Sequence, residues 1–330
     1  MEIRGKRFLL TGGASLIGSH VTERLLAGGA ASVVLFDDYS LGSRELAAAL
    51  GRDARVRVVR GDILRPNELF DALEDVDGVF ALAAFLTLPL SRNPVLGMDV
   101  NVRGMLNVLE ACRWRGVKKV VFSSSVATFG DPDTTDIDED TPFRWQHAQP
   151  ATTLYGATKI IGECLGRLYK QRYGIDFVAL RYSTVYGERQ HLRGINALHI
   201  VEAYEAIKAG RRPVLPGDGT QAYDYVYAGD VARANLMAMG SAVTEESFII
   251  ATGVDTSLNE IVKILGRLTN RDLEPEYRTD PSKPRTQMKP KLGYSPAKAK
   301  RLLGWAPEVA IEDGIERLIR WTEAERVSDR

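Results

Sequence analysis

The sequence contains little cysteine, no excess of charge and no long apolar run. Among 330 residues the only cysteines are Cys112 and Cys164. They form neither a metal-ligand spacing nor a disulfide framework, which favours a reducing compartment. The 43 Lys and Arg residues balance 43 Asp and Glu residues, so no basic surplus marks nucleic acid as the main partner. Because no apolar run approaches the roughly 20 residues of a membrane span, we expect a cytoplasmic protein that binds neither nucleic acid nor a membrane.

Histidine is also scarce, and its spacing does not predict a metal site. The sequence is 45% hydrophobic and 26% charged, which excludes a disordered chain and is typical of a globular protein. At about 150 residues per domain, the chain forms one large domain or two. The histidines lack the spacing of metal ligands, and we expect each to be a helix, loop or substrate-rim residue; they are His20, His147, His191 and His199.

The first half alternates short runs rich in β-branched residues with longer segments of helical periodicity. In one segment Ile17, Val21 and Leu25 recur every four residues, and a second covers Val100–Cys112. Regular alternation of strands and helices predicts an α/β fold, a doubly wound parallel sheet with helices on both faces. The expected strands are Arg7–Thr11, Ser32–Phe36, Val56–Arg60, Gly78–Leu82, Val117–Phe122 and Phe177–Arg181.

The alternation becomes looser after residue 182. Gly and Pro cluster between residues 210 and 219, and Ser257 followed by Glu260 predicts a capping box at a helix start. We therefore divide the chain into a sheet domain, residues 1–182, and a smaller mixed α/β lobe, residues 183–330, with some later segments returning to the first domain. Ligands of open α/β sheets bind at the carboxyl ends of the strands, so the lobe is expected to bind substrate there.

A glycine-rich turn joins the first strand to the first helix, over Thr11–Gly18 (TGGASLIG). Glycines at such a turn let the backbone approach a pyrophosphate, and the helix N-terminus favours its negative charge. Asp37 ends the second strand, where a carboxylate accepts hydrogen bonds from ribose hydroxyls, and Asp38 follows it. Because two carboxylates would repel a 2′-phosphate, the sequence favours NAD over NADP. The residues expected around the phosphates are Gly12, Gly13, Ser15, Leu16, Ile17 and Gly18.

With this turn, the chain resembles over essentially its whole length the extended short-chain dehydrogenase/reductase family, which contains NAD-dependent sugar epimerases and dehydratases. The resemblance implies a Rossmann-type domain that binds NAD. The family usually has glycine where this chain has Ser15. We predict that Ser15 adopts a negative φ and still permits binding, with a hydroxyl able to donate to a phosphate.

Further cofactor positions follow from the same resemblance. Asp62 matches the residue that holds the adenine amino group, although a carboxylate there also suits the N-terminus of a helix. Asn101 matches an asparagine that supports the active site. The remaining cofactor positions that we expect are Ile63, Leu82, Ala83, Ala84, Ser123 and Tyr182.

A strand that ends in three serines precedes a Tyr–Lys pair. Tyr155 and Lys159 are four residues apart and share one face of a helix. A tyrosine with its ordinary pKa of about 10 is a poor base at neutral pH, but an adjacent ammonium and the positive nicotinamide of NAD⁺ favour the phenolate. By resemblance, Tyr155 moves the proton, Lys159 also holds the nicotinamide ribose, and Ser125 hydrogen-bonds the reacting oxygen. Ser123 or Ser124 is expected to serve a turn.

The two residues after Ser125 narrow the reaction. Family members that dehydrate a sugar carry an Asp–Glu pair there, and those that decarboxylate a uronic acid place a Glu nearby, whereas this chain has Val126 and Ala127. Neither side chain moves a proton. We therefore expect 4-epimerisation of a nucleotide-linked sugar, a UDP-hexose or UDP-hexuronic acid, through a 4-keto intermediate. The alternatives are a reductase, dehydrogenase or decarboxylase acting on a nucleotide sugar, and a non-catalytic NAD(H)-binding scaffold.

The second half of the chain indicates the substrate less clearly. Thr184 and Arg189 lie in a segment similar to that of UDP-glucuronic acid 4-epimerases, where the threonine helps to hold a carboxylate and an arginine can pair with an anion. The family usually has a phosphate-binding arginine where this chain has Tyr223, and Arg285 matches a second one. Helices near residues 100–112 and 154–173 match those of a family homodimer, which we expect here too.

Overall fold

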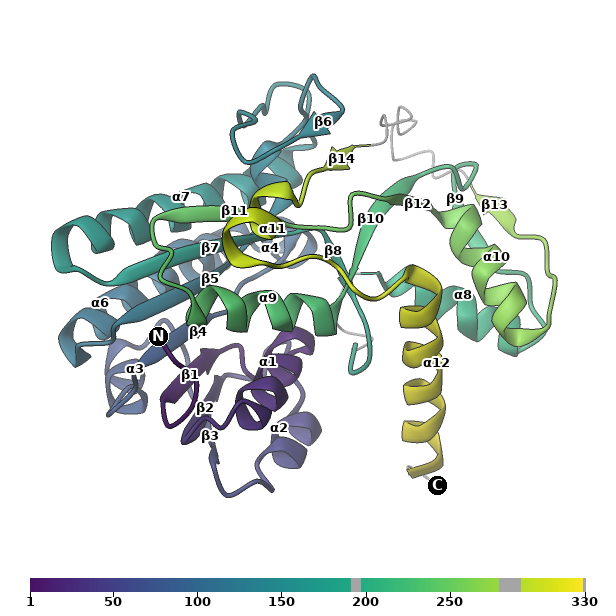
Figure 1. Cartoon of the computed structure of the whole chain (residues 1–330). Helices are drawn as coiled ribbons and strands as arrows, with labels where there is room; N and C mark the ends of the chain where they lie inside the picture. Colours follow the sequence, from purple (N-terminus) through teal and green to yellow (C-terminus); the bar gives the residue numbers. More distant parts are fainter. Residues whose placement is uncertain (191–196, 279–291, 329–330) are drawn as a thin grey trace.

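The computed structural model describes residues 1–190, 197–278 and 292–328. Its largest element is a parallel seven-stranded sheet in the order β11-β7-β5-β4-β1-β2-β3 (Figure 1). Its central strands are buried along almost their whole length, because helices cover both faces of the sheet. The predicted doubly wound α/β fold is confirmed. The strands are β1 (Arg7–Thr11), β2 (Ser32–Asp37), β3 (Val56–Arg60), β4 (Gly78–Ala81), β5 (Lys119–Ser125), β7 (Asp176–Tyr182) and β11 (Glu246–Ile250).

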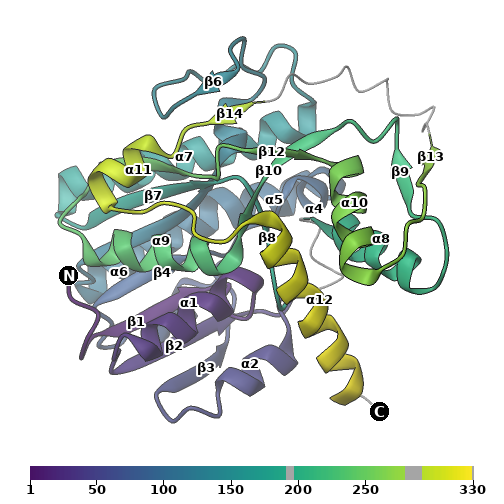
Figure 2. The ribbon, with the colours of Figure 1, turned by 45° about the vertical axis from the view of Figure 1, so that its right-hand side comes forward.

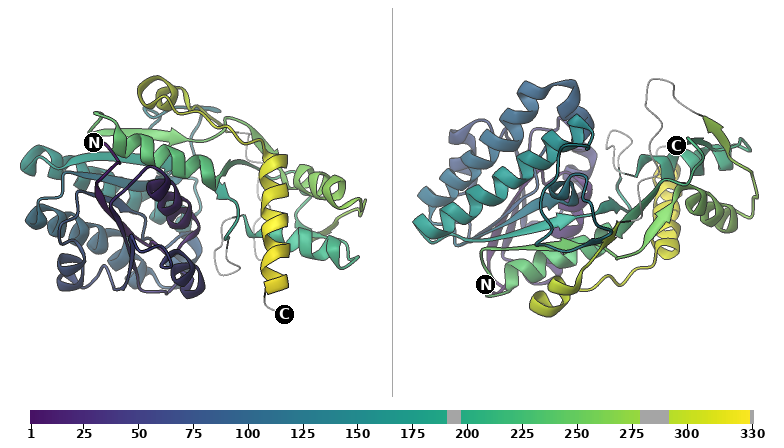
Figure 3. Two further views of the ribbon diagram at one scale, coloured as in Figure 1. Left: turned by 60° about the horizontal axis from the view of Figure 1, so that its bottom comes forward. Right: turned by 90° about the horizontal axis from the view of Figure 1, so that it is seen from above.

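Two separate hydrophobic clusters fill the two faces of the sheet, and the view from above shows helices on both of these faces (Figure 3). On one face the helices are α1 (Leu16–Ala27), α2 (Arg44–Leu50), α9 (Ala228–Gly240) and α11 (Ala297–Leu303). On the other face they are α3 (Pro66–Ala72), α6 (Met105–Arg115) and α7 (Pro150–Tyr173). Within the described residues, none of the helices is long and apolar enough to span a membrane.

The connections near the carboxyl edge of the sheet contain short helices. The short helices α4 (Thr87–Arg92) and α5 (Pro94–Met98) follow β4, and a 3₁₀ turn, η2 (Val126–Phe129), follows β5. The predicted helix over residues 100–112 is in fact two elements, because a π-helical segment, η1 (Asp99–Gly104), precedes α6. Such segments occur often at functional sites.

A smaller lobe extends from the carboxyl edge of the sheet (Figure 2). In it β8 (Thr184–Tyr186) pairs in parallel with β10 (Ala222–Tyr227), which pairs antiparallel with β12 (Asp255–Ser257). The predicted capping box at Ser257 is confirmed. The helices of this lobe share a third hydrophobic cluster; they are α8 (Leu198–Lys208), α10 (Leu258–Thr269) and α12 (Ile311–Ser328). The remaining strand pairs are β9 (Val214–Pro216) with β13 (Glu276–Arg278), and β6 (Asp136–Ile137) with β14 (Gly293–Tyr294).

The chain returns from the lobe to the sheet. Helix α9 packs on α1, and β11 pairs with β7 at the edge of the sheet. Both elements follow residue 182, so part of the second half completes the first domain, and the boundary at residue 182 itself stays a prediction. Strand order reverses between β1 and β4, which is where open α/β sheets bind ligands.

Candidate active site

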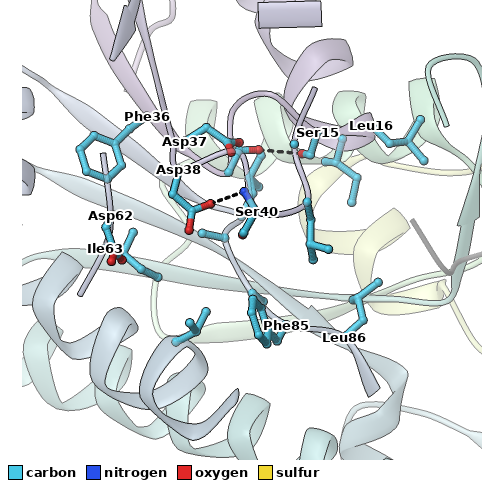
Figure 4. Close-up of a pocket in the computed structure, with 18 of the residues that line it drawn as sticks. Ser15, Leu16, Phe36, Asp37, Asp38, Ser40, Asp62, Ile63, Phe85 and Leu86 are labelled. Atoms are coloured by element: carbon cyan, nitrogen blue, oxygen red, sulfur yellow. Dashed lines mark hydrogen bonds between the residues drawn. The ribbon is translucent and has the colours of Figure 1, made fainter. Parts of the chain in front are cut away.

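A pocket opens at this reversal, between the ends of β1, β2 and β4 (Figure 4). In the figure, Asp37, Asp38 and Asp62 lie toward one side, and Ser15 and Leu16 toward another. The structure brings most of the predicted cofactor residues together here; those in the wall are Gly12, Ser15, Leu16, Ile17, Asp37, Asp38, Asp62, Ile63, Leu82, Ala83 and Ala84.

Several residues of the wall were not predicted. All of them lie within four residues of a predicted cofactor or substrate residue, and this proximity in the sequence was the signal that could have found them. Val185 and Gln190 lie next to predicted substrate residues, and the fold brings them to the cofactor pocket. The unpredicted residues are Phe36, Ser40, Leu41, Gly42, Gly61, Phe85, Leu86, Val100, Val185 and Gln190.

The turn between β1 and α1 leaves no room for side chains at two of its glycines. Gly12 has a φ of 68°, and a Cβ there would lie 2.9 Å from the backbone nitrogen of Ala83. A Cβ on Gly18 would lie 2.5 Å from the carbonyl oxygen of Gly13. These contacts explain why the turn needs glycine, and they leave the backbone bare toward the pocket.

Ser15 caps α1 with a φ of −107°, so its predicted negative φ is confirmed. The hydroxyl donates to the carbonyl of Gly12 at 2.7 Å and accepts from the amide of Gly18 at 3.2 Å. The Ser15 side chain therefore closes the turn on itself, and donation to a phosphate stays a prediction.

The carboxylates at the end of β2 are held by backbone amides. Asp37 accepts from the amides of Ala14 and Tyr39, each at 2.9 Å, and Asp38 accepts from Ser40 at 2.8 Å. Burial raises the pKa of Asp37, and the two amide hydrogen bonds oppose that rise. The arrangement ties the glycine turn to the end of β2 and places two carboxylates where the ribose of a dinucleotide is expected.

Three other predicted cofactor residues already have partners within the protein. Asp62 accepts from the amide of Leu64 at 2.8 Å, in the loop before α3, whose N-cap residue is Arg65 and not Asp62. Tyr182 has a buried hydroxyl that accepts from Ser123 at 3.3 Å and from Asn235 at 2.8 Å. Contacts of these side chains with a cofactor stay predictions.

Asn101 joins the pocket to α7. Its side-chain oxygen accepts from the amide of Phe85, a wall residue, at 2.7 Å. Its amide group donates to the carbonyl of Phe85 at 2.9 Å and to the hydroxyl of Thr158 on α7 at 3.1 Å. All three bonds are internal, which suits the expected supporting role; direct contact with the cofactor stays a prediction.

Ser125, Tyr155 and Lys159 meet at the end of β5. Tyr155 and Lys159 are buried on the same face of α7, and the ammonium lies 5.6 Å from the centre of the Tyr155 ring. Tyr155 shares a side-chain hydrogen bond with Ser125. Lys159 donates to the carbonyl of Ser123 at 2.7 Å. The predicted catalytic residues are therefore assembled, and their roles in catalysis stay predictions.

In the protein alone, desolvation penalises the charged forms of both Tyr155 and Lys159. Burial raises the pKa of Tyr155 to about 12, and the hydrogen bond from Ser125 opposes this rise only in part. Burial also lowers the pKa of Lys159 to about 7, while the carboxylate of Glu163 opposes that fall. The expected phenolate needs the positive nicotinamide of NAD⁺ as well as Lys159, so that expectation stays a prediction.

The expectation that Ser123 or Ser124 serves a turn is wrong. Both serines lie inside β5 and are buried. The Ser124 hydroxyl donates to Glu163 at 2.5 Å, and the Ser123 hydroxyl donates to Tyr182. The strand continues because β7 pairs with it as far as Ser125.

The predicted substrate residues are less well assembled. Thr184 begins β8 and is half-buried. Arg189 forms an ion pair with Glu23 of α1, and Tyr223 stacks on His199. Arg285 and His191 lie outside the described residues. Within the described ranges, no group of three or more His, Cys, Asp or Glu side chains could hold a metal ion.

A bare glycine turn with two carboxylates opposite it fits a dinucleotide, and a buried Tyr–Lys pair fits proton transfer beside it. Fold and site together define a dinucleotide-dependent enzyme that moves a hydride and a proton. The chain belongs to the NAD dependent epimerase/dehydratase family, whose model matches residues 8–251.

Relatives cover almost the whole chain. A putative UDP-glucose 4-epimerase of Methanocaldococcus jannaschii is 35% identical over 95% of this chain and 97% of its own. The UDP-glucose 4-epimerase of Thermotoga maritima, solved with UDP-glucose, has a TM-score of 0.83 at 30% identity and covers 97% and 99% of the two chains. The UDP-glucuronic acid 4-epimerase of Bacillus cereus, solved with UDP-glucuronic acid and NAD, has a TM-score of 0.83 at 26% identity and the same coverage.

Proposed function

We propose that the protein is an NAD-dependent 4-epimerase of a UDP-sugar, either a UDP-hexose or a UDP-hexuronic acid. The observation that carries the proposal is the group of Ser125, Tyr155 and Lys159, followed directly by Val126 and Ala127 in η2. Dehydration or decarboxylation calls for a further acid or base, whereas epimerisation at C4 needs one group that accepts a proton and returns it. Relatives named as UDP-glucose and UDP-glucuronic acid 4-epimerases support this choice.

Each catalytic side chain has one task in this reaction. Tyr155 takes the proton of the C4 hydroxyl and later returns it to the same oxygen, which Ser125 holds by a hydrogen bond. Lys159 keeps a positive charge one helical turn from Tyr155 and so stabilises the phenolate when the site is assembled. NAD bound in the pocket would accept the C4 hydride in its oxidised form and return it in its reduced form. Because proton and hydride both return to the sugar, there is no net oxidation.

The test is conversion of UDP-sugars without added NAD(H), followed by proton NMR. We expect UDP-glucose or UDP-glucuronic acid to reach an equilibrium mixture with its 4-epimer. Steady accumulation of NADH in the presence of added NAD⁺ would indicate a dehydrogenase instead. Unchanged spectra of protein with bound NAD would indicate a scaffold. Comparison of the two substrates decides whether the enzyme prefers a C6 carboxylate.

The expected homodimer is part of the proposal. Apolar side chains are exposed on α6 and α7, which lie side by side on the outer face of the domain (Figure 3). They include Leu106, Ile161 and Leu168, with 37–44% of each residue exposed. A second copy of the chain would cover this face. Light scattering should give twice the mass of the chain, and Leu168→Glu should shift it toward the monomer. A cytoplasmic location stays a prediction, supported by two cysteines that are both free.

A further inference from the structure

Three serines of β5 meet three residues on one face of α7. Tyr155, Lys159 and Glu163 follow one another at intervals of four residues, so each stands one helical turn beyond the last. Tyr155 bonds to Ser125, Lys159 to the carbonyl of Ser123, and Glu163 to the hydroxyl of Ser124. The third contact repeats the pattern of the two catalytic ones, yet the proposed reaction does not use Glu163.

The Glu163 carboxylate accepts hydrogen bonds from three side chains. It accepts from Ser124 at 2.5 Å, from Ser247 of β11 at 2.8 Å, and from the guanidinium of Arg181 of β7 at 3.0 and 2.8 Å. Only 4% of Glu163 is exposed. The hydrogen bonds hold the carboxylate charged despite its burial, and its pKa is lowered because the bonds to Arg181, Ser124 and Ser247 outweigh desolvation. Strands β5, β7 and β11 therefore all form hydrogen bonds to α7 at this residue.

The groups around Lys159 come from three elements. Tyr155 and Glu163 flank it on α7, and the Phe122 ring of β5 lies 5.0 Å from the ammonium. Tyr182 of β7 bonds to Ser123, the residue whose carbonyl accepts from Lys159. Among these neighbours Glu163 carries the negative charge.

A second layer surrounds Glu163. Arg181 also donates to the carbonyl of Glu139, whose carboxylate accepts from the amide of Ile249. Lys298 lies near Glu139 and pairs with Glu246. These charges affect Glu163 only through Arg181. The carboxylate of Glu163 itself opposes the lowering of the Lys159 pKa.

We propose that Glu163 is a positioning residue of the active site: its buried carboxylate favours the charged form of Lys159 against the effect of burial and fixes α7 against the serines of β5. The kinetic readout of this inference rests on the proposed function, but its spectroscopic readout does not.

The test substitutes Glu163→Gln, which keeps the shape and removes the charge. The Lys159 resonance is followed by NMR in the full chain with ¹³C-labelled lysine and added NAD, with Lys159→Met used for assignment. We expect the titration midpoint of Lys159 to fall by about one pH unit. The alkaline limb of the kcat profile should move to lower pH by a similar amount, with less change in KM.

Asp230→Asn is the matched control. Asp230 is a buried carboxylate that pairs with Arg233 and accepts from the amides of Glu308 and Val309, on the opposite face of the sheet. This control should lower Tm without moving the Lys159 midpoint. A midpoint that is unchanged in Glu163→Gln, or that moves equally in Asp230→Asn, would overturn the inference.

A double variant separates charge from folding. Glu163→Gln alone leaves the Arg181 guanidinium buried without its partner, which destabilises the fold. In Glu163→Gln with Arg181→Gln, Tm should recover while the Lys159 midpoint stays low; recovery of both would show a purely structural role. If the wild-type protein converts no UDP-sugar but the midpoint falls as expected, the proposed function fails and the inference stands.

Discussion

The cofactor half and the substrate half of the site are built differently. The cofactor half consists of strand ends and a turn whose backbone amides bind Asp37, so the sheet itself fixes its geometry. In the substrate half, Arg189 pairs with Glu23 and Tyr223 stacks on His199. Backbone groups thus hold the cofactor half, whereas contacts between side chains hold the predicted substrate residues. Substitutions in the cofactor half should weaken cofactor binding, and those in the substrate half should change the preference between substrates.

The largest effect is expected for Lys159→Met. Loss of the ammonium beside Tyr155 should lower kcat by at least about 100-fold. Burial lowers the pKa of Lys159 to about 7 in the folded protein, from 10.5 for the free group. The unfolded chain therefore binds more protons between pH 7 and 10.5, and this lysine makes the wild-type protein more stable as pH rises through that window.

Thermal unfolding of the wild type and of Lys159→Met from pH 6 to 10 tests the direction of this change of stability with pH. Lys159→Met lacks the cost of the buried ammonium, so its advantage over wild type should be greatest at the acid end and shrink as pH rises. A variant that is less stable than wild type by the same margin at every pH would contradict the assignment.

Gly12→Ala tests the cofactor half of the site, which backbone groups hold in place. The residue has a φ of 68°, and its added Cβ would lie 2.9 Å from the amide nitrogen of Ala83. We expect a loss of about 1–2 kcal/mol of stability from the backbone conformation and a fall in NAD affinity of more than about tenfold. Gly116→Ala is the control, because Gly116 has a φ of 70° with nothing within 4 Å of the added Cβ. Calorimetry should find its NAD affinity unchanged.

Asp37→Asn should have an intermediate effect. Without the carboxylate charge, NAD should bind about tenfold more weakly, and the preference against NADP should narrow, because one of two repelling charges is gone. Titration with NAD and with NADP measures the ratio of the two affinities. An unaltered preference would place the discrimination elsewhere, with Asp38 as the next candidate.

The smallest effect is expected for Arg189→Ala. If Arg189 joins a substrate carboxylate, KM should rise for UDP-glucuronic acid and not for UDP-glucose. The rise should stay below about tenfold, because the guanidinium must leave Glu23 to make the contact and exchanges one ion pair for another. Equal changes for the two substrates would show that the ion pair with Glu23 only holds the lobe against α1.

The sequence predicted the part of the site that depends on strand ends. Asp37 and Ala83 follow apolar strands, and parallel strands present their carboxyl ends at one edge, so their placement follows from the order of the chain. Strand β11 was not predicted, because its pairing with β7 depends on a return of the chain from the lobe. The role of Ser124 could not be read either, since Glu163 and Arg181 meet it only after α7 packs on the sheet.

The pKa of Tyr155 could not be predicted from the sequence for the same reason. A Tyr–Lys spacing indicates which groups are near each other, but burial, which raises the pKa of Tyr155 to about 12, exists only in the folded protein. The catalytic shift therefore has to come from the complete assembly of protein, cofactor and substrate.

Tyr155→Phe tests the central claim most directly. The variant keeps the ring, the packing of α7 and the dinucleotide pocket, and loses only the hydroxyl that we propose moves the proton. Interconversion of UDP-sugars should fall by at least about 100-fold, while calorimetry finds NAD affinity within about twofold of wild type. Epimerisation at the wild-type rate by Tyr155→Phe would contradict the account.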